Sequence, residues 1–578
     1  MTELTRRRVL QQSAVVGGAT VGLAAGRSTT ASARPAPPVP PGTPTAFDTV
    51  TVRPGDPRYA ELARGTNQRW VGRPDSIRVV DSADQVVAVV REAVAARKRI
   101  AVRSGGHCYE DFTTNPEVKV VIDLSELNDV TYDAGHRAFA VGPGAWLSDV
   151  YSTLFKVWGV TIPGGSCPSV GAGGHIVGGG YGALSRQFGL TVDHLYGVEV
   201  VVVDEQHTVR KVLATRDSTD PRLRDLWWAH TGGGGGNFGI ITKYLLRSPG
   251  ATGTDPGRLL PRPPAELLTS TVTWPWEGLT KRGFKRLVKN YGDWFVRNSA
   301  PDSPHLDLFS QLKPAHRSGG VITMVTQIDA TRPNARHDLD AFIAEVGRGV
   351  GVRPTAATQK LPFLHATKWP GFAGGDPTLR FEDKSAYVRA SFPDDQLEAI
   401  HRHLTRDDYA NPAALLLIAG YGGRINSVAP DATAVAQRDS VMKLQYLAFW
   451  QDEAEDARHL RWVREFYRDV YARTGGVPVP GRVTDGCFVN YADVDLSDPE
   501  WNTSGVPWHT LYYKANYPRL QRIKAAWDPH GVLRHAQSVV PAAAAPSAAV
   551  TAGAGAPEAA GAPGAAGAAP GGTRHGRG

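Results

Sequence analysis

Glycine-rich segments that also carry reactive side chains stand out in the middle of this 578-residue sequence. Glycine at such density lets the backbone approach a ligand closely, and successive N–H groups can then form a concave site for an anion. A pyrophosphate held by main-chain amides is the natural occupant, and flexible loops are the alternative interpretation. The segments are 103–107 (Arg-Ser-Gly-Gly-His), 163–167 (Pro-Gly-Gly-Ser-Cys), 171–175 (Gly-Ala-Gly-Gly-His), 178–182 (Gly-Gly-Gly-Tyr-Gly) and 231–239 (Thr-Gly-Gly-Gly-Gly-Gly-Asn-Phe-Gly).

The phosphate-binding motifs of other nucleotide enzymes are missing where they would be needed. No Gly-x-Gly-x-x-Gly opens the fold and is followed by an acidic residue at the usual distance. No Gly-x-x-x-x-Gly-Lys-Ser/Thr occurs, which argues against phosphoryl transfer on a P-loop. A Ser-His-Asp site is not supported either, because there is no nucleophile elbow. The residues by themselves therefore indicate a nucleotide-like anion and do not specify which one.

Helical and strand-like patterns alternate around these segments. Residues 84–96 have apolar side chains at helical spacing after Asp84, which predicts a helix. Strand-like runs follow at 99–102, 118–124 and 198–203, rich in β-branched residues. This half of the chain is therefore expected to be α/β or α+β in character.

Composition and charge exclude several classes of protein. Hydrophobic residues make up 42% and charged residues 21% of the chain, as in an ordinary globular protein and unlike a disordered or polytopic membrane protein. The net charge of +8 is scattered, so no nucleic-acid partner is expected. Three cysteines without a Cys-x-x-Cys pair cannot form a disulfide scaffold, and they argue against structural zinc; no metal site is predicted.

Residues 1–33 have the pattern of an export signal. Arg6, Arg7 and Arg8 precede an uncharged small-residue stretch and an Ala31-Ser32-Ala33 cleavage site. Adjacent arginines with moderate hydrophobicity resemble a bacterial twin-arginine signal, and the apolar part is too short for a membrane anchor. We therefore expect a secreted, extracellular protein that meets the twin-arginine export machinery already folded.

Two further terminal segments are expected to lie outside the folded part. Residues 34–54 include a proline-rich stretch and are predicted to be an N-terminal extension. Residues 541–578 are almost entirely Ala, Gly and Pro and lack the large apolar residues that would offset the entropy of ordering. They are predicted to be a disordered tail.

Ordered motifs from about residue 55 to 540 resemble the FAD-linked oxidases of the berberine bridge enzyme type. The resemblance implies an α+β protein with a two-part FAD-binding domain of the PCMH type (55–250) and a substrate-binding domain with an antiparallel sheet (260–480). It also implies a C-terminal segment (481–540) that returns to the FAD domain. The motifs are Arg103 to Tyr109, Val121 to Ser125, Pro163 to Gly182, Gly236 to Gly239, Phe488 to Leu496, Tyr512 to Leu520 and Trp527 to Pro529.

The resemblance implies FAD held by two covalent bonds, from the imidazole of His107 to the flavin 8α-methyl and from the sulfur of Cys167 to ring carbon 6. Read without it, a lone His in a glycine turn is a polar surface residue and a lone Cys is a small buried hydrophobe. Cys108 and Cys487 are not assigned as anchors. The other predicted cofactor-binding residues are Arg103, Ser104, Gly105, Gly106, Asp123, Gly165, Ser166, Gly171, Gly174, His175, Gly179, Gly180, Gly182, Asn237, Phe238, Gly239 and Asn490.

Two tyrosines are the candidate catalytic residues. Oxidation of an alcohol needs a base within hydrogen-bond reach of the hydroxyl, and an ordinary tyrosine pKa of about 10 is too high for that task near neutrality. Neighbouring donors or positive charge would have to lower the pKa. The family motif places the base at Tyr491, with Tyr109 orienting the substrate or supporting the base. Asp493 and Asp495 are expected on one face of a strand, with structural hydrogen bonds.

The expected function is oxidation of an alcohol on a sugar, with O2 as electron acceptor and H2O2 as product. Residues 502–508 resemble family members that oxidise the sugar of an anthracycline, which favours a glycosylated secondary metabolite as the small-molecule substrate. An oligosaccharide (hemiacetal) oxidase is the near alternative, and a catalytically inactive flavin- or ligand-binding protein is the alternative from another class. Trp274, Trp276, Trp294, Trp369 and Trp450 could stack on a substrate or belong to the core.

Overall fold

The computed structural model describes residues 47–372 and 376–542. The predicted export signal and nearly all of the predicted tail lie outside the described residues. Of the predicted extension, residues 47–54 are described, and they contain strand β1 (Val50–Val52), which pairs with β2 (Ser76–Val79). The domain boundaries given above stay predictions.

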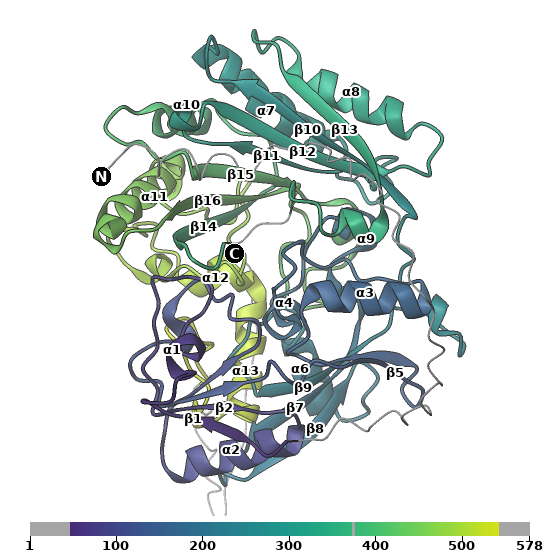
Figure 1. Cartoon of the computed structure of the whole chain (residues 1–578), viewed down its shortest axis with the longest axis vertical. Helices are drawn as coiled ribbons and strands as arrows, with labels where there is room; N and C mark the ends of the chain where they lie inside the picture. Colours follow the sequence, from purple (N-terminus) through teal and green to yellow (C-terminus); the bar gives the residue numbers. More distant parts are fainter. Residues whose placement is uncertain (1–46, 373–375, 543–578) are drawn as a thin grey trace, which may run out of the picture. The chain divides into compact units, whose positions relative to one another are not determined.

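The first sheet has four strands in the order β1-β2-β4-β3, with β3 at Ile100–Arg103 and β4 at Val120–Asp123. Its strands β1 and β2 are labelled in Figure 1. Strands β2, β4 and β3 run parallel, and helix α2 (Ala83–Ala95) connects β2 to β3. The predicted helix and the first two predicted strands are thereby confirmed, with small shifts at their ends. The cap differs from the expectation, because the Ser82 hydroxyl accepts the N–H of Gln85 and Asp84 lies inside the helix.

The second sheet has five antiparallel strands in the order β5-β6-β9-β7-β8. The predicted strand at 198–203 is the second half of its longest member, β7. The glycine-rich segments 171–175 and 231–239 lie in the connections between these strands. The strands are β5 (Val130–Asp133), β6 (Ala138–Val141), β7 (Leu195–Val203), β8 (Val209–Thr215) and β9 (Ile240–Leu246), and the helices of this region are α1 (Tyr59–Leu62), α3 (Leu147–Trp158), α4 (Ala172–Val177), α5 (Ser185–Phe188) and α6 (Pro221–Ala229).

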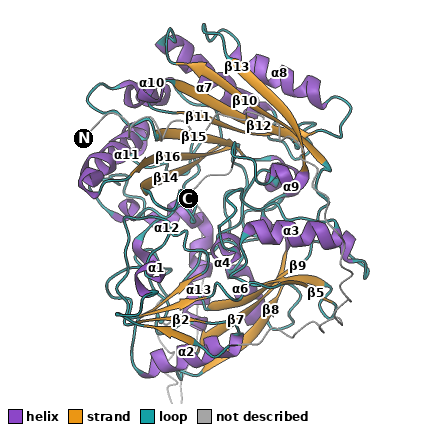
Figure 2. Cartoon of the chain, viewed as in Figure 1, coloured by secondary structure: helices purple, strands orange, loops and turns teal. Residues whose placement is uncertain are grey.

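The third sheet has seven antiparallel strands in the order β13-β10-β12-β11-β15-β16-β14 (Figure 2). Side chains alternate across it, so that Leu312 and Ile418 belong to the core while Gln311 and Leu417 line a cavity. The elements are β10 (Glu266–Pro275), α7 (Lys281–Arg297), β11 (Phe309–Pro314), β12 (Val321–Asp329), α8 (Ala335–Gly347), β13 (Thr355–Pro362), α9 (Phe363–Ala366), β14 (Arg380–Val388), α10 (Asp394–Thr405), β15 (Ala414–Gly420), β16 (Met442–Trp450) and α11 (Asp456–Val470).

The C-terminal segment returns to the first two sheets through helices α12 (Trp508–Tyr513) and α13 (Tyr517–Trp527). The Lys524 ammonium donates to the carbonyl of Asn237 at 2.6 Å and to that of Leu533 at 2.7 Å, while Leu533 forms a parallel bridge with Ile100. The antiparallel third sheet and this return confirm the predicted α+β class. No helix among the described residues is long and apolar enough to cross a membrane.

Candidate active site

A cavity of about 660 Å³ lies between the loops of the first two sheets and the face of the third sheet that carries Gln311 and Leu417. Its volume is that of a site for a small molecule. Loops 103–109, 165–175 and 234–239 form one wall, and strands β11, β15 and β16 form another. The glycine-rich segments, which are far apart in the sequence, thus meet around one space.

The glycines bring two of these loops together backbone to backbone. A Cβ atom at Gly171 would collide with the Ser104 hydroxyl and the Gly105 nitrogen, and one at Gly105 would collide with Gly171. A Cβ atom at Gly182 would overlap the carbonyl of Gly164. Side chains are therefore excluded at these points, which keeps the main chain close to whatever occupies the cavity. These closely packed glycine loops, called the glycine cradle below, fit a nucleotide cofactor.

The two proposed attachment residues lie on the wall of this cavity, in loops that touch. The His107 ring contacts the Ser169 hydroxyl, which is two positions after Cys167, at 3.0 Å. Burial lowers the pKa of His107 to about 4, so its imidazole is neutral near pH 7 and has a nitrogen lone pair available. Tyr151 donates to the carbonyl of Gly165 at 2.6 Å, which holds the loop that carries Cys167.

The buried side chain of His175 also holds the loop that carries Cys167. Its Nε2 accepts the N–H of Gly165 at 3.0 Å, and burial lowers the pKa of His175 to about 3. A neutral ring is the form that can accept this hydrogen bond.

The two candidate catalytic tyrosines lie face to face. The ring centroids of Tyr109 and Tyr491 are 5.3 Å apart and their planes differ by 2°. The carbonyl of Tyr109 accepts hydrogen bonds from Asn67 Nδ2 at 3.1 Å and Trp70 Nε1 at 2.9 Å, and Phe488 packs edge-on against Tyr491. Both hydroxyl-bearing rings are thereby fixed beside the glycine cradle.

Lys443 on β16 supplies the amine that lies next to Tyr491, the predicted base. Its ammonium is 3.2 Å from the Tyr491 hydroxyl, and it lies 4.0 to 4.4 Å from the ring centroids of Tyr181, Phe488 and Tyr491. Burial lowers the pKa of Lys443 well below its usual value and raises the pKa of Tyr491 well above its own. If the Tyr491 phenol gives its proton to the Lys443 amine, a phenolate and an ammonium are in contact. The attraction between them lowers the pKa of Tyr491 and raises that of Lys443, against the effect of burial on each.

Gln445 and Asp383 complete this wall. Gln445 lies two positions after Lys443 on the same face of β16 and donates to the Asp383 carboxylate at 2.5 Å. Burial raises the pKa of Asp383 well above its ordinary value. A negative charge on Asp383 raises the pKa of both Lys443 and Tyr491. The protonation state of Asp383 therefore influences how readily each of the two groups holds its proton.

Similarity to known proteins identifies the family. Residues 74–209 match the family model described as FAD binding domain, and residues 487–540 match the model described as Berberine and berberine like. The chain is 49% identical over 544 residues to aclacinomycin-N/aclacinomycin-A oxidase of Streptomyces galilaeus, covering 94% of this chain and 99% of the relative. The chain belongs to the berberine bridge enzyme type of FAD-linked oxidases. It is accordingly an FAD-linked oxidoreductase that acts on CH–OH groups.

Two further relatives cover most of both chains. Hexose oxidase of Chondrus crispus is 36% identical over 536 residues, which is 84% of this chain and 93% of the relative. A glycopeptide hexose oxidase solved in complex with teicoplanin is 50% identical, with a TM-score of 0.81, and the alignment covers 85% of this chain and 99% of that one. The PCMH-type FAD-binding fold predicted from the sequence is thereby confirmed.

Most of the residues predicted to bind FAD line the cavity of this oxidase, and four do not. Asp123 is buried at the end of β4 and pairs with Arg103, and Phe238 is buried against His230. Gly179 and Gly180 form a turn after α4 in which a side chain at Gly180 would collide with Thr191. These four residues pack against the loops that form the cavity and do not line the cavity themselves. The predicted residues on the wall are Arg103, Ser104, Gly105, Gly106, His107, Tyr109, Gly165, Ser166, Cys167, Gly171, Gly174, His175, Gly182, Asn237, Gly239, Asn490 and Tyr491.

The predicted strand at Asp493 and Asp495 is wrong. Residues Val494–Ser497 form a 3-10 helix, and Asp493 caps it by accepting the N–H of Asp495 at 3.1 Å. The expected structural hydrogen bonding is confirmed, since Lys384 Nζ donates to both carboxylates at 2.6 Å. A short polar side chain that satisfies a helix N-terminus overrides the strand-like spacing.

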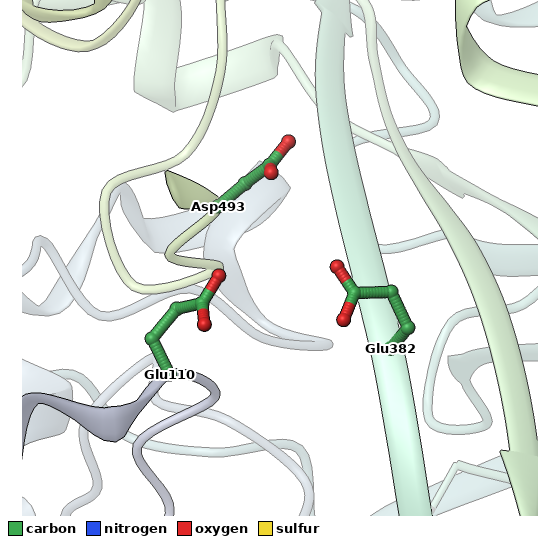
Figure 3. A group of neighbouring side chains, drawn as sticks. All are labelled: Glu110, Glu382 and Asp493. Atoms are coloured by element: carbon green, nitrogen blue, oxygen red, sulfur yellow. The ribbon is translucent and has the colours of Figure 1, made fainter. Parts of the chain in front are cut away.

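A buried group of three carboxylates includes the residue directly after Tyr109 and the residue two positions after Tyr491. Figure 3 shows Glu110, Glu382 and Asp493 arriving from three separate segments of the chain, and their oxygens lie within 4.8 Å of one another. Arg69 pairs with Glu382 and Lys384 with Asp493, while Glu110 accepts the N–H of Val494. The group joins the loop after Tyr109 to the loop after Tyr491 through β14.

Sequence reasoning missed Lys443, Gln445, Tyr181 and Lys313, all of which line the cavity. The available signal was the strand at 442–450, where Lys443 and Gln445 interrupt a run of apolar and aromatic residues with period 2. The tryptophans considered for stacking do not line the cavity, and Trp274, Trp294 and Trp450 belong to the core. Phenylalanine and tyrosine supply the aromatic walls instead.

Proposed function

We propose that this protein oxidises a secondary or hemiacetal alcohol on the sugar of a glycosylated secondary metabolite and reduces O2 to H2O2. The contact of Lys443 with Tyr491 on the wall of the FAD cavity carries the proposal, because it supplies a base for a substrate hydroxyl. Two relatives are named as oxidases of aclacinomycin and of a hexose, which supports a sugar as the oxidised group.

FAD, when bound, accepts the hydride from the carbinol carbon and delivers the electrons to oxygen. The chain residues that would hold it are the backbone amides of the glycine loops, with His107 and Cys167 as covalent attachment points. Neutral His107 and the sulfur of Cys167 are both nucleophiles of the right type. Their loops are in contact through Ser169, so both bonds can form on one cofactor.

The protein's own part in the reaction is to move one proton and to hold the substrate. Tyr491, as tyrosinate beside the Lys443 ammonium, takes the proton of the substrate hydroxyl. Tyr109 stacks on Tyr491 and keeps the base in place. The buried aromatic side chains Phe309, Phe372 and Phe381 limit access of water and offer flat faces to a sugar ring or a polycyclic aglycone.

The first test is a substrate panel with peroxide detection. Purified protein is supplied with anthracycline glycosides, glycopeptides, free hexoses and oligosaccharides, and H2O2 is measured with a coupled peroxidase. We expect turnover of glycosylated metabolites. Preferential turnover of free sugars would support the hemiacetal oxidase, and absence of turnover together with bound flavin would support the inactive binding protein.

The second test concerns the covalent bonds. Acid precipitation should leave a yellow pellet, and mass spectrometry of a digest should place the flavin on the peptides that contain His107 and Cys167. A colourless pellet would refute covalent attachment. A pellet equally yellow in the His107→Ala/Cys167→Ala variant would show that the attachment residues are wrongly assigned.

We also propose that the segment 1–33 directs export through the twin-arginine machinery. The adjacent arginines and the small-residue cleavage site support this proposal. Expression of the full gene in a bacterial host, with and without Arg6 and Arg7 changed to Lys, tests it. Secretion that continues unchanged in the Lys variant would refute it.

A further inference from the structure

Strand β11 carries two polar side chains on the cavity wall for which the proposed oxidation has no use. They are Gln311 and Lys313, and they share a face with Phe309, because alternate residues of a strand point to the same side. All three line the cavity. Gln311 and Lys313, called the β11 pair below, therefore face the space that a substrate would enter.

The β11 pair has hydrogen-bonding capacity to spare. The Lys313 ammonium carries three N–H groups and donates one of them to the carbonyl of Gly371 at 2.8 Å. No carboxylate among the described residues forms an ion pair with it. Oε1 of Gln311 is buried and accepts no hydrogen bond in the part of the chain that the structure describes. Because buried polar groups are normally satisfied, this unused capacity on a cavity wall indicates a ligand.

Aromatic side chains lie next to the β11 pair. Gly371, which accepts the Lys313 hydrogen bond, is followed by Phe372. The ring centroid of Phe372 is 5.1 Å from that of Phe309, and both rings line the cavity. The faces and edges of aromatic rings favour other aromatic rings as neighbours. The surroundings of the β11 pair therefore suit an aromatic ligand that carries a polar group.

The register of the third sheet places the β11 pair relative to the predicted base. Gln311 is paired with Ala419 of β15, and Ala419 is paired with Lys443 of β16, so the three residues lie on one face. Two strand spacings of about 4.8 Å separate the backbones of Gln311 and Lys443 by about 10 Å. Lys443 in turn contacts Tyr491. The group that the β11 pair binds is therefore expected on a different ring of the substrate from the hydroxyl that Tyr491 deprotonates.

We propose that the β11 pair determines substrate specificity by binding an anionic oxygen, a carboxylate or an ionised phenol, on the aromatic aglycone of the substrate. Lys313 supplies the positive charge, and Gln311 accepts a hydrogen bond from a hydroxyl next to the anionic oxygen. The inference rests on the proposed function and names the class of aglycone that the same cavity takes. Neither residue has a part in the chemical step.

A buried ammonium distinguishes an acidic aglycone from a neutral one of the same shape. A hydrogen bond between two charged groups is stronger than one between neutral groups, and a neutral ligand leaves the ammonium desolvated without a counter-charge. Burial lowers the pKa of Lys313 to about 8, so the ammonium is the main form at neutral pH. Specificity then comes from the penalty on the neutral ligand as well as from the attraction of the acid.

The closing experiment measures binding to the holoenzyme by isothermal titration calorimetry at neutral pH. The probes are anthraquinone-2-carboxylate with its methyl ester, and 2-hydroxyanthraquinone with its methyl ether. We expect the wild type to bind the carboxylate, the ionised phenol or both about tenfold or more tightly than the neutral partner, and the acid that shows the preference identifies the source of the anionic oxygen. Lys313→Met should remove the preference, and Lys313→Arg should keep most of it. Lys289→Met, which removes a lysine from the outer surface of α7, is the matched control.

Turnover supplies a second readout that general damage to the fold would not reproduce. For glycosides with an ionised aglycone, Lys313→Met should raise KM about tenfold or more and leave the limiting rate of flavin reduction within about twofold of the wild type. Gln311→Met should raise KM only where a hydroxyl adjoins the anionic oxygen. This split between KM and the limiting rate is the signature of substrate binding away from the reacting carbon.

Equal affinity of the wild type for the acidic and neutral probes, or no binding of any acidic probe, would overturn the inference. A Lys313→Met variant that weakens acidic and neutral binding equally would overturn it as well. So would a variant that keeps the acid preference and instead loses flavin or shifts its absorbance spectrum, because Lys313 would then belong to the cofactor site. If no glycoside is turned over while the acid preference still depends on Lys313, the proposed function fails and the binding inference stands. If Lys313→Met does not fold, Lys313→Gln takes its place.

Discussion

Replacement of Lys443 by Met is the most direct test of how Tyr491 becomes a base. The substitution removes the charge 3.2 Å from the Tyr491 hydroxyl and keeps a similar side-chain length. With an effective dielectric constant of about 20, two unit charges at that distance attract by about 5 kcal/mol. Lys443 is buried and Tyr491 is half-buried, so solvent screens only part of this energy.

The expected decrease in the rate of flavin reduction is large and depends on pH. At about 1.4 kcal/mol for each tenfold change, removal of this attraction corresponds to a loss of about 10² to 10⁴ in the rate of flavin reduction, since part of the energy is recovered by relaxation. Without the ammonium the pKa of Tyr491 rises further. The rate should therefore begin to increase only at a higher pH than in the wild type, by two units or more.

The assay is anaerobic stopped-flow reduction of the flavin by the best substrate of the panel, from pH 6 to 10. Lys289→Met, on the outer surface of α7, is the control and should behave like the wild type. Tyr491→Phe should be as slow as Lys443→Met, and the double variant should be little slower than either, because the two residues act as one unit. A Lys443→Met variant with the wild-type rate and pH profile would show that the ammonium does not activate Tyr491.

Three other predictions concern the cradle and the buried charges. Gly171→Ala should collide with Ser104 and Gly105 and abolish stoichiometric flavin binding, measured by visible absorbance, whereas Gly481→Ala, which lies away from the cavity and where a Cβ meets only ordinary contacts, should bind flavin normally; equal binding by both would contradict the cradle. Lys384→Met should leave Asp493 and Asp495 without their shared cation and lower the free energy of unfolding in urea by about 3 to 5 kcal/mol, and a loss below about 1 kcal/mol would mean that the ion pairs are dispensable. Burial and the neighbouring Glu382 raise the pKa of Glu110, so its contribution to stability is present at low pH and is lost as the pH rises through the folded-state value. Glu110→Gln should therefore gain stability relative to the wild type between pH 5 and 9, and a difference that is independent of pH would refute the raised pKa.

Local patterns in the sequence predicted the local structure well. The apolar spacing of 84–96 and the β-branched runs at 99–102, 118–124 and 198–203 correspond to α2, β3, β4 and β7. Such elements follow from backbone sterics and from the burial of one face, which act over short stretches of chain. The Asp493 and Asp495 pair was misjudged because capping of a short helix competes with strand formation over the same short range.

The sequence by itself determined the chemical components of the site. Glycine loops, His107, Cys167 and the motif around Tyr491 are each readable in order along the chain, and their resemblance to a family identified the cofactor. Glycine has no side chain, so its effect on the backbone is already present in the sequence. Nothing in the chain order, however, relates residue 109 to residue 491, or either of them to residue 443.

Only the tertiary structure decided which charges meet these components. Strand β16 belongs to the third sheet, and its pairing with β14 and β15 sets the register that puts Lys443 and Gln445 on the cavity face. A shift by one residue would turn both side chains into the core. The pKa of a tyrosine depends on charges within a few ångströms, whatever their distance in sequence, and the packing of separate sheets against one cavity supplies them.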